Sequence, residues 1–222
     1  MTEREPPIST HTENLDPPPP SVRQRVSDGA RNVVTPVIRG LVRMGVGPNA
    51  ITVAGFLLVA GSCALILAEL WLAAFFVFVI GSLSDMLDGS VARLTGKSTT
   101  FGAFLDSTLD RLAEGLVLGS LGVVFARDGN EWALAACFVA LIASFLVSYT
   151  RARAEGLGID DNRGGLMSRS ERLFLIGTGL FFAWIDHFLE VVIFLLAVLA
   201  VLTVIQRVAH VWGALRAESR RR

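Results

Sequence analysis

The feature that most constrains this chain is a succession of six apolar stretches between Asn49 and Val208. A helix needs about 20 apolar residues to cross the hydrocarbon core of a bilayer, and most of these stretches reach that length. Hydrophobic residues make up 52% of the chain and its mean hydropathy is +0.56, which is too apolar for an ordinary soluble domain. We therefore expect an all-α integral membrane protein whose six transmembrane helices cover Asn49–Ala68, Leu70–Arg93, Phe101–Phe125, Glu131–Arg153, Arg169–Trp184 and Phe188–Val208.

Basic residues are distributed unevenly around these stretches. They gather before the first stretch, between the second and third, between the fourth and fifth, and after the sixth. The opposite connections hold only Arg127, with acidic residues nearby. Because Lys and Arg favour the cytoplasmic side, we expect a multi-pass protein of the cell (inner) membrane, with both termini and the acidic segment in the cytoplasm.

The two ends of the chain differ from its apolar middle. Residues 1–20 are polar and end in four prolines, which predicts a disordered tail. In residues 21–46 basic and apolar side chains alternate, which predicts an amphipathic helix on the membrane surface. The six-helix domain is expected to cover residues 47–212, followed by a basic C-terminal tail at 213–222.

Four aspartates lie where the second apolar stretch ends and the third begins. Asp85 and Asp88 are three residues apart, and Asp106 and Asp110 are four apart, so each pair shares one face of its helix. A carboxylate beside lipid is costly unless it is paired, hydrated or bound to metal. Since Mg²⁺ prefers oxygen ligands, the pattern predicts a two-metal Mg²⁺ site, with Mn²⁺ as the alternative ion. The competing interpretation is four carboxylates neutralised by arginines and water.

The whole ordered motif, in which Gly89, Ala92, Arg93 and Gly102 separate the aspartates at fixed intervals, resembles the signature of the CDP-alcohol phosphotransferases. These are integral-membrane enzymes of phospholipid synthesis. The resemblance implies that all four aspartates are metal ligands and that Asp110 is also the general base. It further implies contacts to the nucleotide of CDP-diacylglycerol from Pro48, Asn49, Gly89, Ala92, Arg93 and Thr99. For Asn49 and Thr99, helix capping and loop structure are an equal alternative.

The acceptor that attacks CDP-diacylglycerol is indicated by arginines at the cytoplasmic ends of the last three stretches. Arginines from several helices suit a phosphate, which they can bind through two parallel hydrogen bonds. The alternative is that they set the topology and contact lipid headgroups. Between residues 31 and 211 the chain resembles the actinobacterial phosphatidylinositol phosphate synthases, which implies a homodimer and a myo-inositol phosphate pocket formed by Ser148, Arg151, Arg172 and Arg207.

Two other functions fit parts of this pattern. A phosphatidyltransferase that uses glycerol 3-phosphate needs the same aspartates and a phosphate site for its acceptor. A divalent-cation transporter also places carboxylates in a membrane, but the aspartates lie at the ends of two stretches, with no acidic residues continuing across. We expect membrane lipids as partners and no nucleic acid. Metal-dependent release of CMP would separate either enzyme from a transporter.

Overall fold

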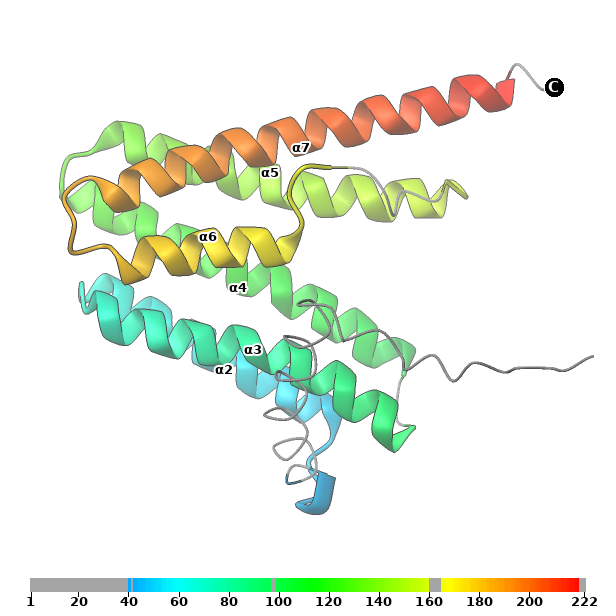
Figure 1. Ribbon diagram of the computed structural model, residues 1–222, viewed down its shortest axis with the longest axis horizontal. Helices are drawn as coiled ribbons and strands as arrows, with labels where there is room; N and C mark the ends of the chain where they lie inside the picture. Colours follow the sequence, from blue (N-terminus) through cyan, green and yellow to red (C-terminus); the bar gives the residue numbers. More distant parts are fainter. Residues whose placement is uncertain (1–39, 41, 97–98, 160–164, 220–222) are drawn as a thin grey trace, which may run out of the picture.

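The computed structural model describes residue 40 and residues 42–96, 99–159 and 165–219 (Figure 1). Its regular elements in these ranges are all helices, as predicted. The helices are α2 (Pro48–Leu67), α3 (Trp71–Thr95), α4 (Thr100–Arg127), α5 (Glu131–Gly156), α6 (Arg169–Phe181) and α7 (Phe188–Ser219). The tail predicted at 1–20 and most of the amphipathic helix predicted at 21–46 lie outside the described residues.

Each apolar stretch corresponds to one helix, but the helices do not all have the expected length. Three of them, α2, α5 and α7, are long and apolar enough to cross a membrane among the described residues. In α3 the described residues include a shorter apolar part, Trp71–Ser84. Helix α6 has 13 residues, and α7 continues to Ser219, so it includes residues that the sequence assigned to the basic tail.

The six helices form a ring in which each packs mainly against two others. The order of the helices around the ring is α2, α3, α6, α7, α5 and α4, and α4 packs against α2 to close it. Figure 1 shows α2 and α3 on one side of the molecule, α5 and α7 on the other, and α4 and α6 between these two pairs. Helices α4 and α6 are therefore not principal neighbours in the ring, and side chains that join them cross its interior.

Helices α2 and α3 approach each other at two glycines. A Cβ atom on Gly81 would lie 2.8 Å from Cγ2 of Val59 and 2.9 Å from the carbonyl oxygen of Gly55. Small residues allow membrane helices to approach closely, and here any larger side chain would meet backbone atoms. Because Gly81 lies one turn before Asp85, this crossing fixes the part of α3 that leads into the aspartate motif.

Candidate functional site

The first half of the aspartate motif lies on the last turns of α3. Asp85, Asp88, Gly89, Ala92 and Arg93 all fall within this helix, as expected. The placement of their side chains lies outside what the structure describes. Among the described side chains, which omit Asp85 and Asp88, no group of three His, Cys, Asp or Glu residues could hold a metal ion. The four-aspartate site therefore stays a prediction.

The second half of the motif lies on α4, where the structure shows an ion pair. The Asp110 carboxylate oxygen Oδ1 is 2.7 Å from Nη2 of Arg169, the first residue of α6. Oδ2 of Asp110 is 4.0 Å from Nη1 of Arg111. The Asp110 side chain is 12% exposed and lines a small crevice between α2, α4 and α6. Asp106 lies one turn earlier on the same face of α4.

The predicted nucleotide contacts Asn49 and Thr99 both lie beside Gly102. A Cβ atom on Gly102 would lie 2.8 Å from Oδ1 of Asn49 and 3.0 Å from Oγ1 of Thr99. Thr99 is the N-cap of α4, because its hydroxyl accepts a hydrogen bond from the Gly102 N–H at 2.9 Å. The N-cap of α2 is Gly47, with Pro48 as its first residue, so Asn49 does not cap its own helix. Thr99 therefore caps a helix and Asn49 does not, and a nucleotide contact of either residue stays a prediction.

Replacing Gly102 by alanine is expected to raise the KM for CDP-diacylglycerol about tenfold or more. The added methyl group would push Asn49 away from the start of α4, and a displacement of about 1 Å at a binding site can cost up to about 100-fold in activity. Steady-state kinetics of CMP release measure this effect. Gly119→Ala is the matched control, because Gly119 lies on the same helix and has no atom within 4 Å of the Cβ position. An equal rise in KM for Gly102→Ala and Gly119→Ala would contradict the predicted contact of Asn49 with the nucleotide.

The predicted acceptor residues Ser148 and Arg207 lie close together at the contact of α5 with α7. Nη1 of Arg207 donates to the carbonyl oxygen of Val147 at 2.7 Å, and the Arg207 side chain is buried. The chain before α6 passes over it, since a Cβ on Gly165 would lie 3.3 Å from Nε of Arg207. Ser148 lines a cleft between α4 and α5, together with Ser107, Thr108, Arg111, Phe145, Tyr149 and Ala152.

The other two predicted acceptor residues have partners elsewhere. Arg151 is exposed and pairs with Glu155 of its own helix, with Nε 2.9 Å from Oε1. Arg172 is 1% exposed and binds Glu114 of α4 through two hydrogen bonds. The acceptor pocket of these four residues therefore stays a prediction. The sequence analysis did not foresee the carboxylate partner of Arg172.

Two residues of this region were missed by the sequence analysis. Arg169 was counted only as one of several basic residues, although it contacts Asp110 directly. Glu114 was not considered at all. Its signal was present in the sequence, because it lies four residues after Asp110 within an apolar stretch, where a carboxylate is costly without a partner.

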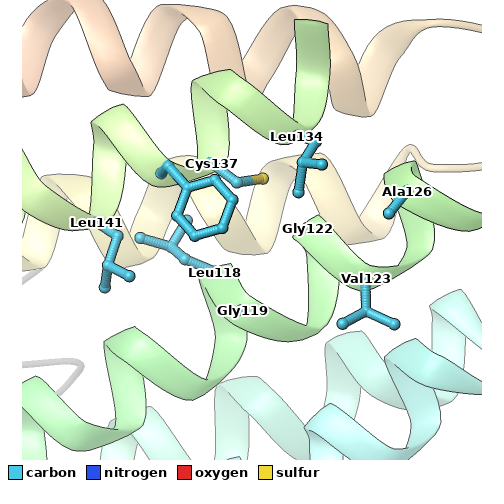
Figure 2. Close-up of a pocket in the computed structure, with 9 residues that line it drawn as sticks. Leu118, Gly119, Gly122, Val123, Ala126, Leu134, Cys137 and Leu141 are labelled. Carbon is cyan, nitrogen blue, oxygen red and sulfur yellow. The ribbon is translucent and has the colours of Figure 1, made fainter. Parts of the chain in front are cut away.

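A second pocket between α4 and α5 has a different character. Figure 2 shows that Leu118, Gly119 and Gly122 of α4 face Leu134 and Cys137 of α5 across it. Its lining consists of apolar side chains, glycines and the buried thiol of Cys137, with no charged side chain that could bind a phosphate. We therefore place the candidate site at the aspartates of α3 and α4 and not in this pocket.

Comparison with known proteins gives a consistent result over most of the chain. A sequence model of the CDP-alcohol phosphatidyltransferase family matches residues 46–215. The phosphatidylinositol phosphate synthase of Corynebacterium glutamicum is 35% identical over 185 residues, which cover 80% of this chain and 83% of that protein. The crystal structure of the Mycobacterium tuberculosis phosphatidylinositol phosphate synthase with CDP-DAG bound is similar, with a TM-score of 0.75 and 36% identity over 82% of this chain and 94% of that one. The same synthase in complex with manganese and citrate gives a TM-score of 0.74 and 37% identity, over 81% and 88% of the two chains.

Proposed function

The chain belongs to the CDP-alcohol phosphatidyltransferase family, and we propose that it transfers the phosphatidyl group of CDP-diacylglycerol to myo-inositol phosphate. The products are phosphatidylinositol phosphate and CMP. The observation that carries this proposal is the similarity, over 82% of the chain, to a synthase of this name whose structure holds CDP-DAG. Membership of an enzyme family does not support the transporter alternative.

The aspartates fit a divalent cation by their chemistry. Four carboxylates offer only oxygen ligands, which suits Mg²⁺ and Mn²⁺. In the structure one oxygen of Asp110 pairs with Arg169 at 2.7 Å, and a metal at this carboxylate would share it with that guanidinium. We propose that Asp85, Asp88, Asp106 and Asp110 hold two Mg²⁺ ions. Manganese bound to the mycobacterial synthase supports a divalent metal in the family. When bound, the metal would stabilise negative charge that develops on the phosphate oxygens.

We propose that Asp110 is the general base, and its position on the crevice between α2, α4 and α6 supports this role. As the acceptor oxygen bonds to the phosphorus of the phosphatidyl group, Asp110 takes the hydroxyl proton. The bond from that phosphorus to the bridging oxygen of the pyrophosphate breaks, and CMP leaves with the bonding electron pair. The remaining predicted contacts, Pro48, Asn49, Gly89, Ala92, Arg93 and Thr99, would hold the nucleotide.

The acceptor phosphate is proposed to bind near the ends of α5 and α7. Ser148 directly follows Val147, whose carbonyl oxygen accepts a hydrogen bond from Arg207, and Arg151 is exposed at the same end of α5. Arg169 adds a guanidinium beside the proposed base. A phosphate in this position would place the inositol hydroxyls near Asp110. Arg172 belongs to this proposed set as well, and its guanidinium also binds Glu114.

The ring of helices supports a six-span topology. Helices α2, α5 and α7 are long and apolar enough to cross the membrane, and α3, α4 and α6 lie between them in the ring. We propose that all six cross, with residues 21–46 as an amphipathic helix on the surface. From the positive-inside pattern of the sequence, we propose that both termini and the active site lie in the cytoplasm. A homodimer in the inner membrane is proposed on the resemblance to the family alone.

Analysis of the lipid product tests the proposed function. Purified protein in vesicles that contain CDP-diacylglycerol would be incubated with Mg²⁺ and myo-inositol phosphate, and the lipids would be identified by mass spectrometry. A lipid with the mass of phosphatidylinositol phosphate is expected. In the alternative outcome, added glycerol 3-phosphate gives phosphatidylglycerol phosphate while no inositol lipid forms. That result would agree with the family and with Asp110 as the base, but it would reject myo-inositol phosphate as the acceptor.

A further inference from the structure

Residues 165–168, which we call the strap, lie directly before α6 and are attached to α7. The backbone N–H of Leu166 donates to Oε1 of Gln206 on α7 at 2.9 Å. Met167 is 4% exposed and belongs to the hydrophobic core. Ser168 is the N-cap of α6. The strap is therefore held by α7 near one end and by α6 at the other.

Gly165 allows the strap to lie directly on α7. Its φ of +121° lies in a region of positive φ that favours glycine. A Cβ atom at this position would lie 2.7 Å from Cγ2 of Thr203 and 3.3 Å from Nε of Arg207. The methyl group of Thr203 is fixed, because the residue is buried and its hydroxyl donates to the carbonyl oxygen of Leu199 at 2.7 Å. The strap therefore approaches Arg207 more closely than a residue with a side chain would allow.

The strap and α5 hold Arg207 from two sides. Nη1 of Arg207 donates to the carbonyl oxygen of Val147 on α5 at 2.7 Å, and Gly165 packs beside Nε. Only 8% of Arg207 is exposed. A planar guanidinium binds phosphate through two parallel hydrogen bonds, so its affinity for phosphate depends on how its plane is turned. The strap therefore contributes to the orientation in which Arg207 would meet an acceptor phosphate.

The strap also leads directly to the ion pair at the proposed base. Arg169 follows Ser168, and its Nη2 lies 2.7 Å from Oδ1 of Asp110. The Ser168 N–H donates to the Glu171 carboxylate in a capping box, which satisfies backbone donors and fixes the first turn of α6. One short segment thus connects the acceptor arginine of α7 with the carboxylate that is proposed to take the acceptor proton.

We propose that Gln206 is a positioning residue for the acceptor: it holds the strap through Leu166, and the strap keeps the guanidinium of Arg207 in the orientation that binds the acceptor phosphate. This inference rests on the proposed function, in which Arg207 is a ligand of that phosphate. Gln206 is exposed, so replacing it leaves the hydrophobic core intact. The role concerns binding of the acceptor and not of CDP-diacylglycerol.

Replacing Gln206 by methionine tests the hydrogen bond to the strap. Methionine has a similar length but is only a weak acceptor for the Leu166 N–H. We expect the KM for myo-inositol phosphate to rise about tenfold, because a displacement of about 1 Å at a binding site can cost up to about 100-fold. The kcat and the KM for CDP-diacylglycerol should stay within about twofold of wild type, as expected when only acceptor binding is weakened.

The matched control for this variant is His210→Met. His210 is exposed and lies one turn after Gln206 on the same face of α7. Its replacement should leave both KM values and the melting temperature unchanged. A normal acceptor KM in Gln206→Met would overturn the proposal, and so would an equal rise in the KM of both substrates.

Replacing Gly165 by alanine tests the contact of the strap with Arg207. Gly158→Ala is the matched control, because Gly158 also has a positive φ, +77°, yet no atom of a described residue beyond its chain neighbours lies within 4 Å of its Cβ position. Both variants carry backbone strain, but only Gly165→Ala pushes the strap away from Arg207. We expect Gly165→Ala to raise the KM for myo-inositol phosphate about tenfold or more, and Gly158→Ala to raise it less than about twofold.

Two results of this comparison would contradict the proposal. Equal rises in KM would show that strain in the connection, and not contact with Arg207, weakens acceptor binding. A normal KM in Gly165→Ala, together with a raised KM in Gln206→Met, would make Gln206 a direct ligand of the acceptor and not a positioning residue.

Hydrogen exchange at the amide of Leu166 gives a readout that does not depend on activity. An N–H held in a hydrogen bond exchanges more slowly than one that is open to water, so Leu166 should be protected in wild type and exchange faster in Gln206→Met. Equal exchange in the two proteins would reject the role of Gln206. If wild type released CMP with no phosphorylated acceptor, the proposed function would fail, while exchange at Leu166 would still test how the strap is held.

Discussion

Replacing Asp110 by asparagine is expected to lower the rate of CMP release by about 100- to 10,000-fold, the range that a general base contributes. Asparagine keeps an oxygen for the metal and has nearly the same shape, but it cannot accept the proton of the acceptor hydroxyl. Binding of Mn²⁺ and of CDP-diacylglycerol, followed by titration calorimetry, should therefore remain within about tenfold of wild type. The kcat should fall far more than either affinity.

Because Asp110 also pairs with Arg169, the change has a second consequence that needs its own control. Asparagine weakens the contact in which Nη2 of Arg169 lies 2.7 Å from Oδ1. Arg169→Gln removes the same ion pair but leaves the carboxylate of Asp110 in place. If Arg169→Gln reduced kcat as much as Asp110→Asn, the loss would come from the ion pair and not from the base. Normal turnover of Asp110→Asn would remove Asp110 from the base role altogether.

Removal of divalent metal is expected to abolish CMP release completely. Four carboxylates without cations would repel the pyrophosphate of the substrate, and no other group would neutralise the charge on the leaving nucleotide. Treatment with EDTA followed by dialysis should leave no measurable activity. Added Mg²⁺ or Mn²⁺ should restore it, whereas Ca²⁺ should restore little, because its larger and more irregular coordination shell suits a different geometry.

The control for the EDTA experiment tests whether the metal-free protein remains folded. The melting temperature of the metal-free protein shows whether EDTA has unfolded it, and restoration by added metal shows that the loss is reversible. Activity that persists in EDTA would contradict a metal-dependent displacement. Recovery with K⁺ alone would also contradict it, since a monovalent cation cannot provide the charge that the pyrophosphate requires.

The sequence predicted the existence and type of the helices better than their ends. The start of α5 at Glu131 was predicted correctly, and the structure shows why the helix starts there: the side chain of Asn130 accepts a hydrogen bond from the Ala133 N–H at 3.0 Å. The ends were predicted less well, because hydropathy follows the apolar part of a helix while backbone hydrogen bonds continue past it. Helix α7 consequently runs to Ser219, although its apolar stretch ends at Val208.

For the candidate site, local spacing was informative and long-range pairing was not. The spacing of Asp106 and Asp110 placed both on one face of α4, and the structure agrees. It could not show that Arg169, 59 residues after Asp110, would reach that carboxylate, because this depends on how α6 lies in the ring. The same limit applies to Arg172. The sequence placed Arg172 in the acceptor pocket, but it could not show that the guanidinium also binds Glu114.

The most direct test of this account is an acceptor panel with purified protein, CDP-diacylglycerol and Mg²⁺. Myo-inositol phosphate, glycerol 3-phosphate, free inositol and serine would be offered separately, and the release of CMP would be measured for each. The account predicts release with myo-inositol phosphate and at most trace release with the other three. Release with glycerol 3-phosphate alone would contradict the proposed acceptor, and release with free inositol would show that the arginines near Asp110 do not bind a phosphate.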